Sequence, residues 1–339
     1  MSLTPSYAMP QGAQLSLLDK TVTVASWLLG CGVFLTVGWM ALRPDDPQGA
    51  VSVLTRGGPL KTLLQAAALS SVAAAVGTVL AGRRLSDAGT FAAAVGLAAV
   101  SLRGGTVATL LVSGAEGSGY GEHGLAIRFA AESLGWFGVV VMALLVSALA
   151  ARWCFGDSEA SPAADPLRLL ASRRLAACDA PRLGPALFGV SPARQTAPRD
   201  GLVHTLITAG VGVMALGLLS KGLGTRSIQH GQVCFGVFVG VAVAATMAYR
   251  FVPVRSPLWS ILAVPLIALT GYLWAALRPA EPGLPPNMPS SHFLRVLPIQ
   301  YVGVGTVAAL TAFWYVAKEA YGGAVDPAHK KRPAPKRAG

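Results

Sequence analysis

Eight apolar runs of roughly 20 residues each limit what this chain can fold into more than any other feature of its sequence. A helix of that length spans the ~30 Å hydrocarbon core of a bilayer at ~1.5 Å per residue. The pattern predicts an all-α fold, a polytopic transmembrane helical bundle of about eight membrane-spanning helices. The expected spans are Val22–Leu42, Thr62–Gly82, Gly89–Ser113, Phe129–Ala151, Leu202–Ser220, Gly231–Tyr249, Pro257–Leu277 and Pro298–Ala317.

The composition points the same way. Hydrophobic residues make up 53% of the chain and charged residues only 12%, with a mean hydropathy of +0.56. A soluble domain carries about 25% charged residues, because they must cover its surface. Much of this surface is therefore expected to face a lipid bilayer. The sequence predicts a multi-pass protein of the cell (inner) membrane.

Polar segments divide the chain into five parts. Residues 1–21 form a flexible N-terminal segment, and residues 318–339 form a disordered basic tail. Between two helical halves, residues 22–151 and 202–317, lies a basic loop at residues 152–201 that holds seven of the 27 Lys and Arg residues. The net charge of +12 is thus concentrated beside apolar spans, where it sets orientation or contacts anionic lipid. Nucleic acid is not an expected partner.

Counting Lys and Arg in the connecting segments predicts the orientation. With the N-terminus on the cytoplasmic side, the inner segments carry 18 of these residues and the outer segments carry 9. Cytoplasmic loops carry the excess of positive charge in membrane proteins. Both termini are therefore expected to be cytoplasmic.

Arg103 is the sharpest candidate for a functional residue. Followed by Gly104 and Gly105, it interrupts the third apolar run. A guanidinium within the hydrocarbon costs a few kcal/mol, so it usually faces the bundle interior and has a partner. Glu132 is the nearest acidic candidate in the fourth run, and the two together form a candidate transport or structural polar site. In the alternative interpretation the third span ends near Leu102, and Arg103 marks the outer interface.

Small residues recur every fourth position in the sixth run. Gly236, Gly240, Ala244 and Ala248 predict a helix-packing face, because small side chains let helix backbones approach closely in lipid. Pro265, inside the seventh run, predicts a kink.

Histidine and cysteine give no metal or cofactor site by their spacing. His123, His230 and His292 are expected on the outer side with Met288, but they come from separate loops, so loop or interface histidines are favoured over a metal centre. His204 is expected on the inner side. The four cysteines form no CxxC pair and are expected to be isolated thiols. We therefore expect no cofactor and no bound metal.

Two short motifs have ordinary explanations. The tetrapeptide PSSH at Pro289–His292 is similar to part of the motif set of type 2 phosphatidic acid phosphatases, but the two companion motifs of those enzymes do not occur. The segments ALRPDDP at Ala41–Pro47 and ALRPAEP at Ala276–Pro282 echo each other at the ends of two spans. An Arg-Pro stop signal after a helix is favoured over duplication of a helical hairpin.

Two function classes follow from these observations, with a membrane enzyme as the third. The first is a non-enzymatic membrane component or a subunit of a complex with other membrane proteins, supported by the small-residue faces and the scarcity of buried charge. The second is a small-solute permease with a site near Arg103 and Glu132, supported by the interrupted third run and by Pro265.

Overall fold

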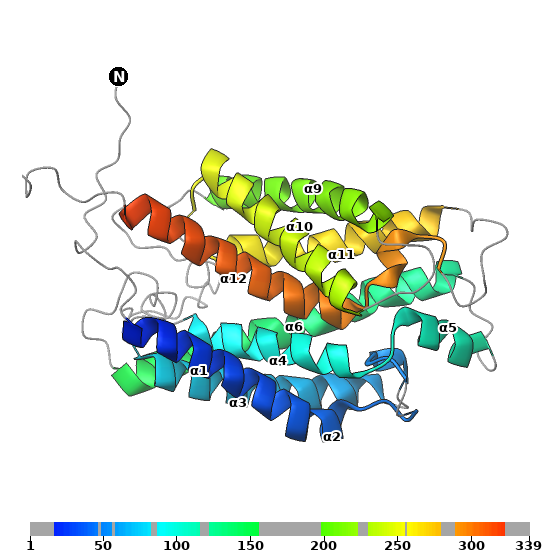
Figure 1. Cartoon of the computed structure of the whole chain (residues 1–339), viewed down its shortest axis with the longest axis horizontal. Coiled ribbons are helices and arrows are strands. Elements are labelled where there is room, and N and C mark those ends of the chain that lie inside the picture. The colour runs from blue at the N-terminus through cyan, green and yellow to red at the C-terminus, as the bar shows by residue number, and fades with distance from the viewer. Residues whose placement is uncertain are drawn as a thin grey trace, which may run out of the picture.

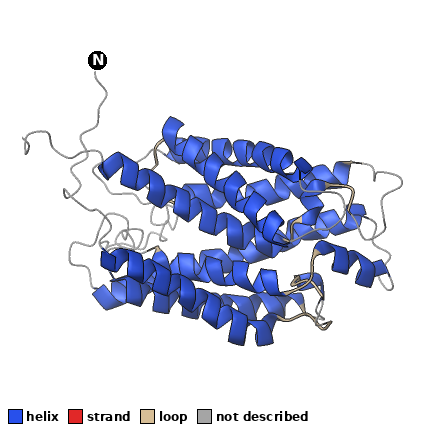
Figure 2. Cartoon of the chain, viewed as in Figure 1, coloured by secondary structure: helices blue, strands red, loops and turns tan. Residues whose placement is uncertain are grey.

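The computed structural model describes residues 17–46, 49–55, 58–82, 87–115, 122–155, 198–222, 230–254, 256–278 and 289–322. Every regular element in these ranges is a helix (Figure 2), apart from one isolated bridge between Ala50 and Gly105. Residues 1–16, most of the basic loop (156–197) and the tail from residue 323 lie outside the described residues. The expectations for these parts of the chain, and that for Met288, stay predictions.

The helices of the first half run from α1 to α6. Helix α1 continues through a π-helical turn, Phe34–Gly38, into the short helix α2. The bounds are α1 Leu17–Val33, α2 Trp39–Leu42, α3 Pro59–Ala81, α4 Ala88–Arg103, α5 Val107–Ala115 and α6 Glu122–Phe155.

The second half contributes four long helices. Two 3-10 turns lie in loops, at Val53–Thr55 before α3 and at His292–Arg295 before α12. The bounds are α9 Pro198–Gly222, α10 His230–Phe251, α11 Leu258–Leu277 and α12 Pro298–Gly322.

The two halves form two layers of roughly parallel and antiparallel helices (Figure 1). They meet where α6 packs against α11 and where α12 packs against α4 and α6. The helices α1, α4, α9 and α11 all begin at one end of the bundle, which we call the proximal end. The helices α3, α6, α10 and α12 begin at the opposite end, which we call the distal end; α5 lies there.

Seven of the described helices are long and apolar enough to cross a membrane. They include α3, α6 and α9 to α12, and the first is the stretch Thr21–Leu42, which covers most of α1 and all of α2. Helix α4 is apolar but only 16 residues long. The protein is therefore an all-helical bundle compatible with a multi-pass membrane protein.

The third apolar run differs from the sequence-based expectation of one helix at Gly89–Ser113. The structure divides it into α4 and α5, because Gly104 adopts an extended backbone and Gly105 pairs with another segment. Hydropathy does not detect such a break, since the residues on both sides are apolar. Helix α6 also begins at Glu122, seven residues before the expected Phe129.

Helix α4 lies in the middle of the bundle, in contact with α1, α3, α6 and α12. Nearly every side chain from Ala88 to Ser101 is buried. Ala and Gly make this burial possible, because they let neighbouring backbones approach. At Gly96, for example, the ring of Phe34 occupies the space that a Cβ atom would need.

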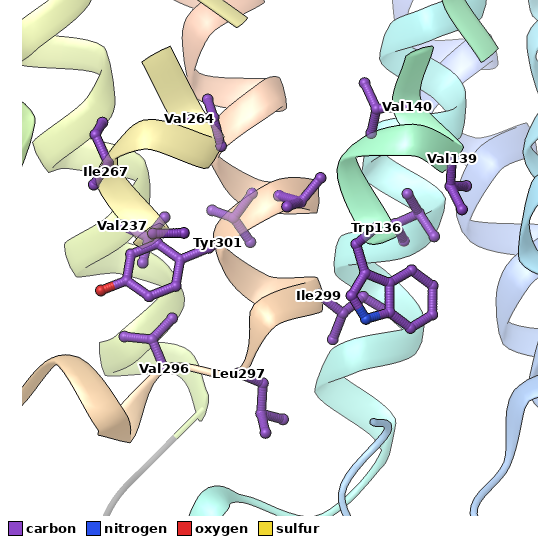
Figure 3. Close-up of a cluster of buried hydrophobic side chains, with 14 of the residues drawn as sticks. Trp136, Val139, Val140, Val237, Val264, Ile267, Val296, Leu297, Ile299 and Tyr301 are labelled. Atoms are coloured by element: carbon purple, nitrogen blue, oxygen red, sulfur yellow. The ribbon is translucent and has the colours of Figure 1, made fainter. Parts of the chain in front are cut away.

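Helix α12 joins the two layers. In Figure 3 its Ile299 points toward Trp136 of α6, while Tyr301 points away toward Val237 of α10 and Ile267 of α11. All of these side chains are buried and belong to one continuous hydrophobic core. The middle of the interface between the halves is therefore apolar.

The outer surface of the bundle carries many large apolar side chains. A water-soluble monomer rarely exposes apolar patches this extensive, so these positions are suited to contact with lipid. Examples are Leu64 of α3, Leu206, Met214 and Leu218 of α9, Phe235 of α10 and Leu273 of α11.

Substitutions at two glycines of α1 can test how this helix packs against α4. A Cβ atom at Gly30 would overlap the carbonyl oxygen of Ala92, whereas a Cβ at Gly32 meets nothing within 4 Å. We expect Gly30→Ala to lower the free energy of unfolding by about 1–3 kcal/mol, the usual cost of overpacking. Gly32→Ala, the matched control, should unfold like the wild type or slightly later. Thermal unfolding in detergent measures both, and equal destabilisation by the two variants would contradict the packing of α1 on α4.

Candidate functional site

The break between α4 and α5 is built against a loop segment from the first half. The amide of Gly105 donates to the carbonyl of Gly49 at 2.7 Å, and Ala50 forms the bridge with Gly105. A Cβ atom on Gly104 would lie 2.8 Å from Val51 Cγ2 and 3.0 Å from its backbone nitrogen. Residues 50–53 are themselves buried. Glycine is thus required for the close approach of the two backbones.

Glu132 of α6 forms hydrogen bonds with the residues that follow in this segment. Its carboxylate accepts hydrogen bonds from the hydroxyl of Ser52 at 2.6 Å and from the amide of Val53 at 2.9 Å. The indole of Trp136, one turn along α6, donates to the same carboxylate at 2.8 Å. Glu132 is only 6% exposed. Three donors therefore offset the cost of removing the carboxylate from water.

A histidine from the second half of the chain, His230 of α10, contacts the same break between α4 and α5. The side-chain amide of Gln300 donates to His230 Nδ1 at 2.9 Å, so the other ring nitrogen, Nε2, carries the hydrogen and is held by the carbonyl of Gly104. Gln300 itself is fixed because its oxygen accepts from the amide of Leu297 at 3.0 Å. These contacts tie α10 and α12 to the end of α4.

Arg103 is the last residue of α4 and is exposed. Its guanidinium donates to the carbonyl of Leu35 and lies over the ring of Trp39, 4.8 Å from the centroid. Leu35 belongs to the π-helical turn of the first span. Such turns disturb the regular pattern of backbone hydrogen bonds and are frequent at functional sites.

The structure thus gives Arg103 and Glu132 different partners. Arg103 contacts the first span, and Glu132 binds segment 49–55, which also packs against the residue after Arg103. We call the assembly of Ser52, Val53, Arg103, Gly104, Glu132, Trp136, His230 and Gln300 the distal polar centre. Its members come from both halves of the chain.

A second carboxylate of α6 is held in a similar way. Glu122 accepts from the amide of Ser290 at 2.9 Å and from its hydroxyl. The neighbouring His123 contacts the carbonyl of Ala276 through Nδ1 at 2.8 Å. The PSSH motif is therefore placed in a loop that is anchored to the first turn of α6.

The remaining predicted positions lie elsewhere. The small face of α10 is buried within the chain, and a Cβ atom at Gly240 would lie 3.0 Å from Leu216 of α9. His292 is in the 3-10 turn before α12, and His204 lies at the proximal end. Within the ranges that the structure describes, no group of three His, Cys, Asp or Glu side chains could hold a metal ion. The positions of the small face are Gly236, Gly240, Ala244 and Ala248.

Sequence reasoning missed Ser52, Val53, His230 and Gln300 as parts of this centre. The residues between the first two expected spans, 43–61, would form a polar connecting loop, yet five consecutive residues there, 50–54, are AVSVL. This apolar run between two prolines is the signal that indicates a buried segment. No comparable signal connects His230 with Gly104, because the contact is made to a backbone carbonyl.

Comparison with known proteins adds no assignment. No protein-family model, curated protein or solved structure matches this chain. The function has to be argued from the residues and their geometry.

The three donors around Glu132 lead to a prediction about the stability of Glu132 variants. Glu132→Ala leaves the Ser52, Val53 and Trp136 donors without their acceptor, at about 1–3 kcal/mol for each buried group left unsatisfied. We expect this variant to lose more stability than Glu132→Gln, which keeps one acceptor oxygen. The measurement is thermal unfolding in detergent followed by tryptophan fluorescence. Unfolding of Glu132→Ala at the wild-type temperature would show that this carboxylate does not hold segment 49–55 in place.

Proposed function

We propose that this protein is a multi-pass membrane permease for a small solute, and that the distal polar centre is its solute site. The observation that supports this most is the discontinuous helix α4–α5, with Arg103 and Gly104 at its break. Transporters commonly form their substrate sites from such broken helices, because the break exposes backbone groups and helix ends within a protected interior.

The buried polar side chains also favour this class over a simple scaffold. An ionisable residue inside a membrane bundle is costly and is usually retained for a function. Glu132 is buried next to the interface between the halves, and His230 of the other half, held in place by Gln300, contacts the break at Gly104. A site shared by two helical halves is suited to alternating access, in which one half moves against the other.

The small-residue faces, in contrast, give less support to a scaffold than the sequence indicated. The α10 face packs inside the chain against α9, and the face on α3 that contains Ala66, Ser70 and Ala74 is likewise buried. These residues are occupied by intramolecular packing. The buried small-residue faces are therefore not available to another subunit.

Arg103 suggests the charge of the solute. Its guanidinium has five N–H donors, one nitrogen is bonded to Leu35, and the side chain remains exposed at the distal end. Planar guanidinium groups bind carboxylates and phosphates with two parallel hydrogen bonds. We therefore propose a small anionic or zwitterionic solute.

We also propose eight membrane crossings, with both termini cytoplasmic in the inner membrane. Helix α4 begins at the proximal end and finishes at the distal end, so it crosses the bundle although it measures only about 24 Å at 1.5 Å per residue. Surrounding helices shield it from lipid, so its length need not match the bilayer. The excess of Lys and Arg in the segments assigned to the inner side supports this orientation.

A non-enzymatic membrane component is the second candidate. The observation in its favour is that each carboxylate oxygen of Glu132 already accepts a hydrogen bond from the chain itself. In this second candidate the role of the carboxylate is structural: it holds segment 49–55 in place.

Arg278 offers a matched control for a transport experiment. Like Arg103, it stacks on a tryptophan, with its guanidinium 4.7 Å from the ring centroid of Trp274, but it lies outside the distal polar centre. We expect some carboxylates, amino acids or phosphate to raise the unfolding temperature of the purified protein, because a ligand at a hundredfold excess over Kd adds about 2.7 kcal/mol to the free energy of unfolding. Uptake of the same solute into proteoliposomes should be lost in Arg103→Ala and kept in Arg278→Ala.

Two results would decide against the permease. One is that no member of the panel stabilises the protein or enters the proteoliposomes faster than it enters protein-free liposomes. The other is that Arg103→Ala and Arg278→Ala transport equally well. Glu132→Gln completes the set, since it removes the charge of the carboxylate while preserving its shape.

A further inference from the structure

The two halves of the chain also contact each other at the rim of the distal end, through the first turn of α6. Glu122, the first residue of this helix, accepts hydrogen bonds from the Ser290 amide at 2.9 Å and from the Ser290 hydroxyl. The Nδ1 atom of His123 lies 2.8 Å from the carbonyl oxygen of Ala276 on α11. A carbonyl oxygen only accepts, so His123 Nδ1 carries a hydrogen and donates it. We call Glu122, His123, Ala276 and Ser290 the distal latch.

The distal latch is built on a part of α6 that is not needed to cross a bilayer. This helix has 34 residues and measures about 51 Å at 1.5 Å per residue, whereas a hydrocarbon core is about 30 Å thick. The span expected from hydropathy begins at Phe129, seven residues after Glu122. Glu122 is only partly buried and His123 is exposed. Water can therefore replace each hydrogen bond of the latch when the contact opens, so opening costs far less than it would within the hydrocarbon.

Apolar side chains form the middle of the interface between the halves. Ile299 of α12 points toward Trp136 of α6 (Figure 3), and at the proximal end the rings of Phe91 on α4 and Trp314 on α12 have centroids 4.9 Å apart. Apolar contacts have no preferred direction, so two such surfaces can shift while they stay in contact. Hydrogen bonds, in contrast, need a defined distance and angle. A displacement of the halves at the distal end therefore breaks the latch first.

The buried part of the distal polar centre lies inward of the latch. Glu132 is ten residues along α6 from Glu122, about 15 Å at 1.5 Å per residue, and Gln300 follows Ser290 by ten residues. Glu132 is 6% exposed and Gln300 is 1% exposed, whereas Arg103 is exposed. A solute that first meets Arg103 needs the halves to separate at this end before it can contact the buried polar groups.

We propose that the distal latch is the outer gate of the permease, whose release admits the solute to the buried part of the distal polar centre. The inference rests on the proposed function, since it names how access to that solute site is controlled. Opening exchanges three hydrogen bonds within the protein for hydrogen bonds to water. The solute favours the open arrangement because it gains contacts there beyond Arg103.

A fixed structural contact is the alternative interpretation of the same hydrogen bonds. In that case the halves stay together at the distal end, and joining them covalently changes neither access nor transport. The two interpretations therefore differ in what a crosslink does, whatever the latch contributes to stability.

Cys234 can report the opening of the gate without any solute. It is a partly buried residue of α10, one turn after His230, whose ring contacts the break at Gly104. The other three cysteines are first replaced by alanine. We then expect a water-soluble thiol reagent to react with Cys234 at least about tenfold faster in Glu122→Ala than in the protein with an intact latch, because the variant lacks two of the hydrogen bonds that hold the gate closed.

Asp200→Ala is the matched control for this measurement. Asp200 is likewise the acidic residue in the first turn of a long helix, α9, but it is exposed at the proximal end. Its removal alters the same kind of helix terminus without affecting the latch, so Cys234 should react at the unaltered rate. Ser290→Ala, which removes only a hydroxyl, should also speed the reaction and gives the decision should Glu122→Ala fail to fold.

The decisive experiment joins the halves across the latch. The substitutions Glu122→Cys and Ser290→Cys are combined and linked by a short reagent with two thiol-reactive groups. We expect the link to stop uptake of the carboxylate, amino acid or phosphate that the wild type takes into proteoliposomes, and reductive cleavage of the linker to restore it. The control combines Glu122→Cys with Leu125→Cys, which places the same reagent on α6 alone, and it should transport whether linked or not.

The outcomes separate the gate from the permease. Uptake that continues at full rate while the halves are linked overturns the gate and leaves the permease standing. Equal rates of Cys234 reaction in the intact latch, Glu122→Ala and Ser290→Ala also overturn the gate. A wild type that takes up no member of the panel refutes the permease, and the gate with it.

Discussion

The structure depends on one constraint, that backbone N–H and C=O groups inside a membrane bundle must be bonded within the protein. Helix α4 ends after 16 residues, and the groups beyond its last turn need partners. The Gly49 carbonyl and the ring of His230 supply them. This requirement explains why residues 50–53 are buried and why α10 begins with a histidine. It also explains why Glu132 lies where it does, since the same loop needs an acceptor for the amide of Val53.

Small side chains decide where the polar groups can lie. Helix α4 is central because its Gly and Ala residues let α1, α3, α6 and α12 surround it. Helix α12 then fills the layer between the halves with Ile299, Val302 and other apolar residues. The larger polar side chains Glu132, His204 and His230 lie toward the ends of the bundle, where neighbouring segments supply donors and acceptors. The distal polar centre and the buried cluster of His204, Ser260 and Tyr249 at the proximal end are separated by a largely apolar middle.

Much of the helical framework could be predicted from the sequence, because hydropathy reports directly on solvent preference. The seven long helices of the structure coincide with seven of the predicted apolar runs. The break in the third run could be suspected at Gly104 and Gly105 but not located, since its cause is a contact between Gly105 and Gly49, 56 residues earlier. Pairing Arg103 with Glu132 assumed that a buried charge seeks the nearest opposite charge. Here neutral donors hold Glu132. Trp136 is one helical turn away, but Ser52 and Val53 lie 80 and 79 residues earlier, and no spacing rule anticipates those two. The buried contact between His204 and Ser260 was equally hidden, because 56 residues separate them.

The two carboxylates of α6 show how the halves are mechanically connected. Glu132 binds the serine and amide of the loop between α2 and α3, and Glu122 binds the serine and amide of the loop between α11 and α12. Both loops follow the echoed segments that begin at Ala41 and Ala276, and each contains a 3-10 turn before a helix that starts with proline. One helix thus holds a hairpin from each half by the same chemistry. A displacement of the halves at the distal end must break the Glu122 contacts or carry α6 along with the second half, and α6 in turn moves Glu132 against the break in α4. If the distal polar centre is the solute site proposed above, the carboxylates of α6 would convert a relative motion of the two layers into a change at that site.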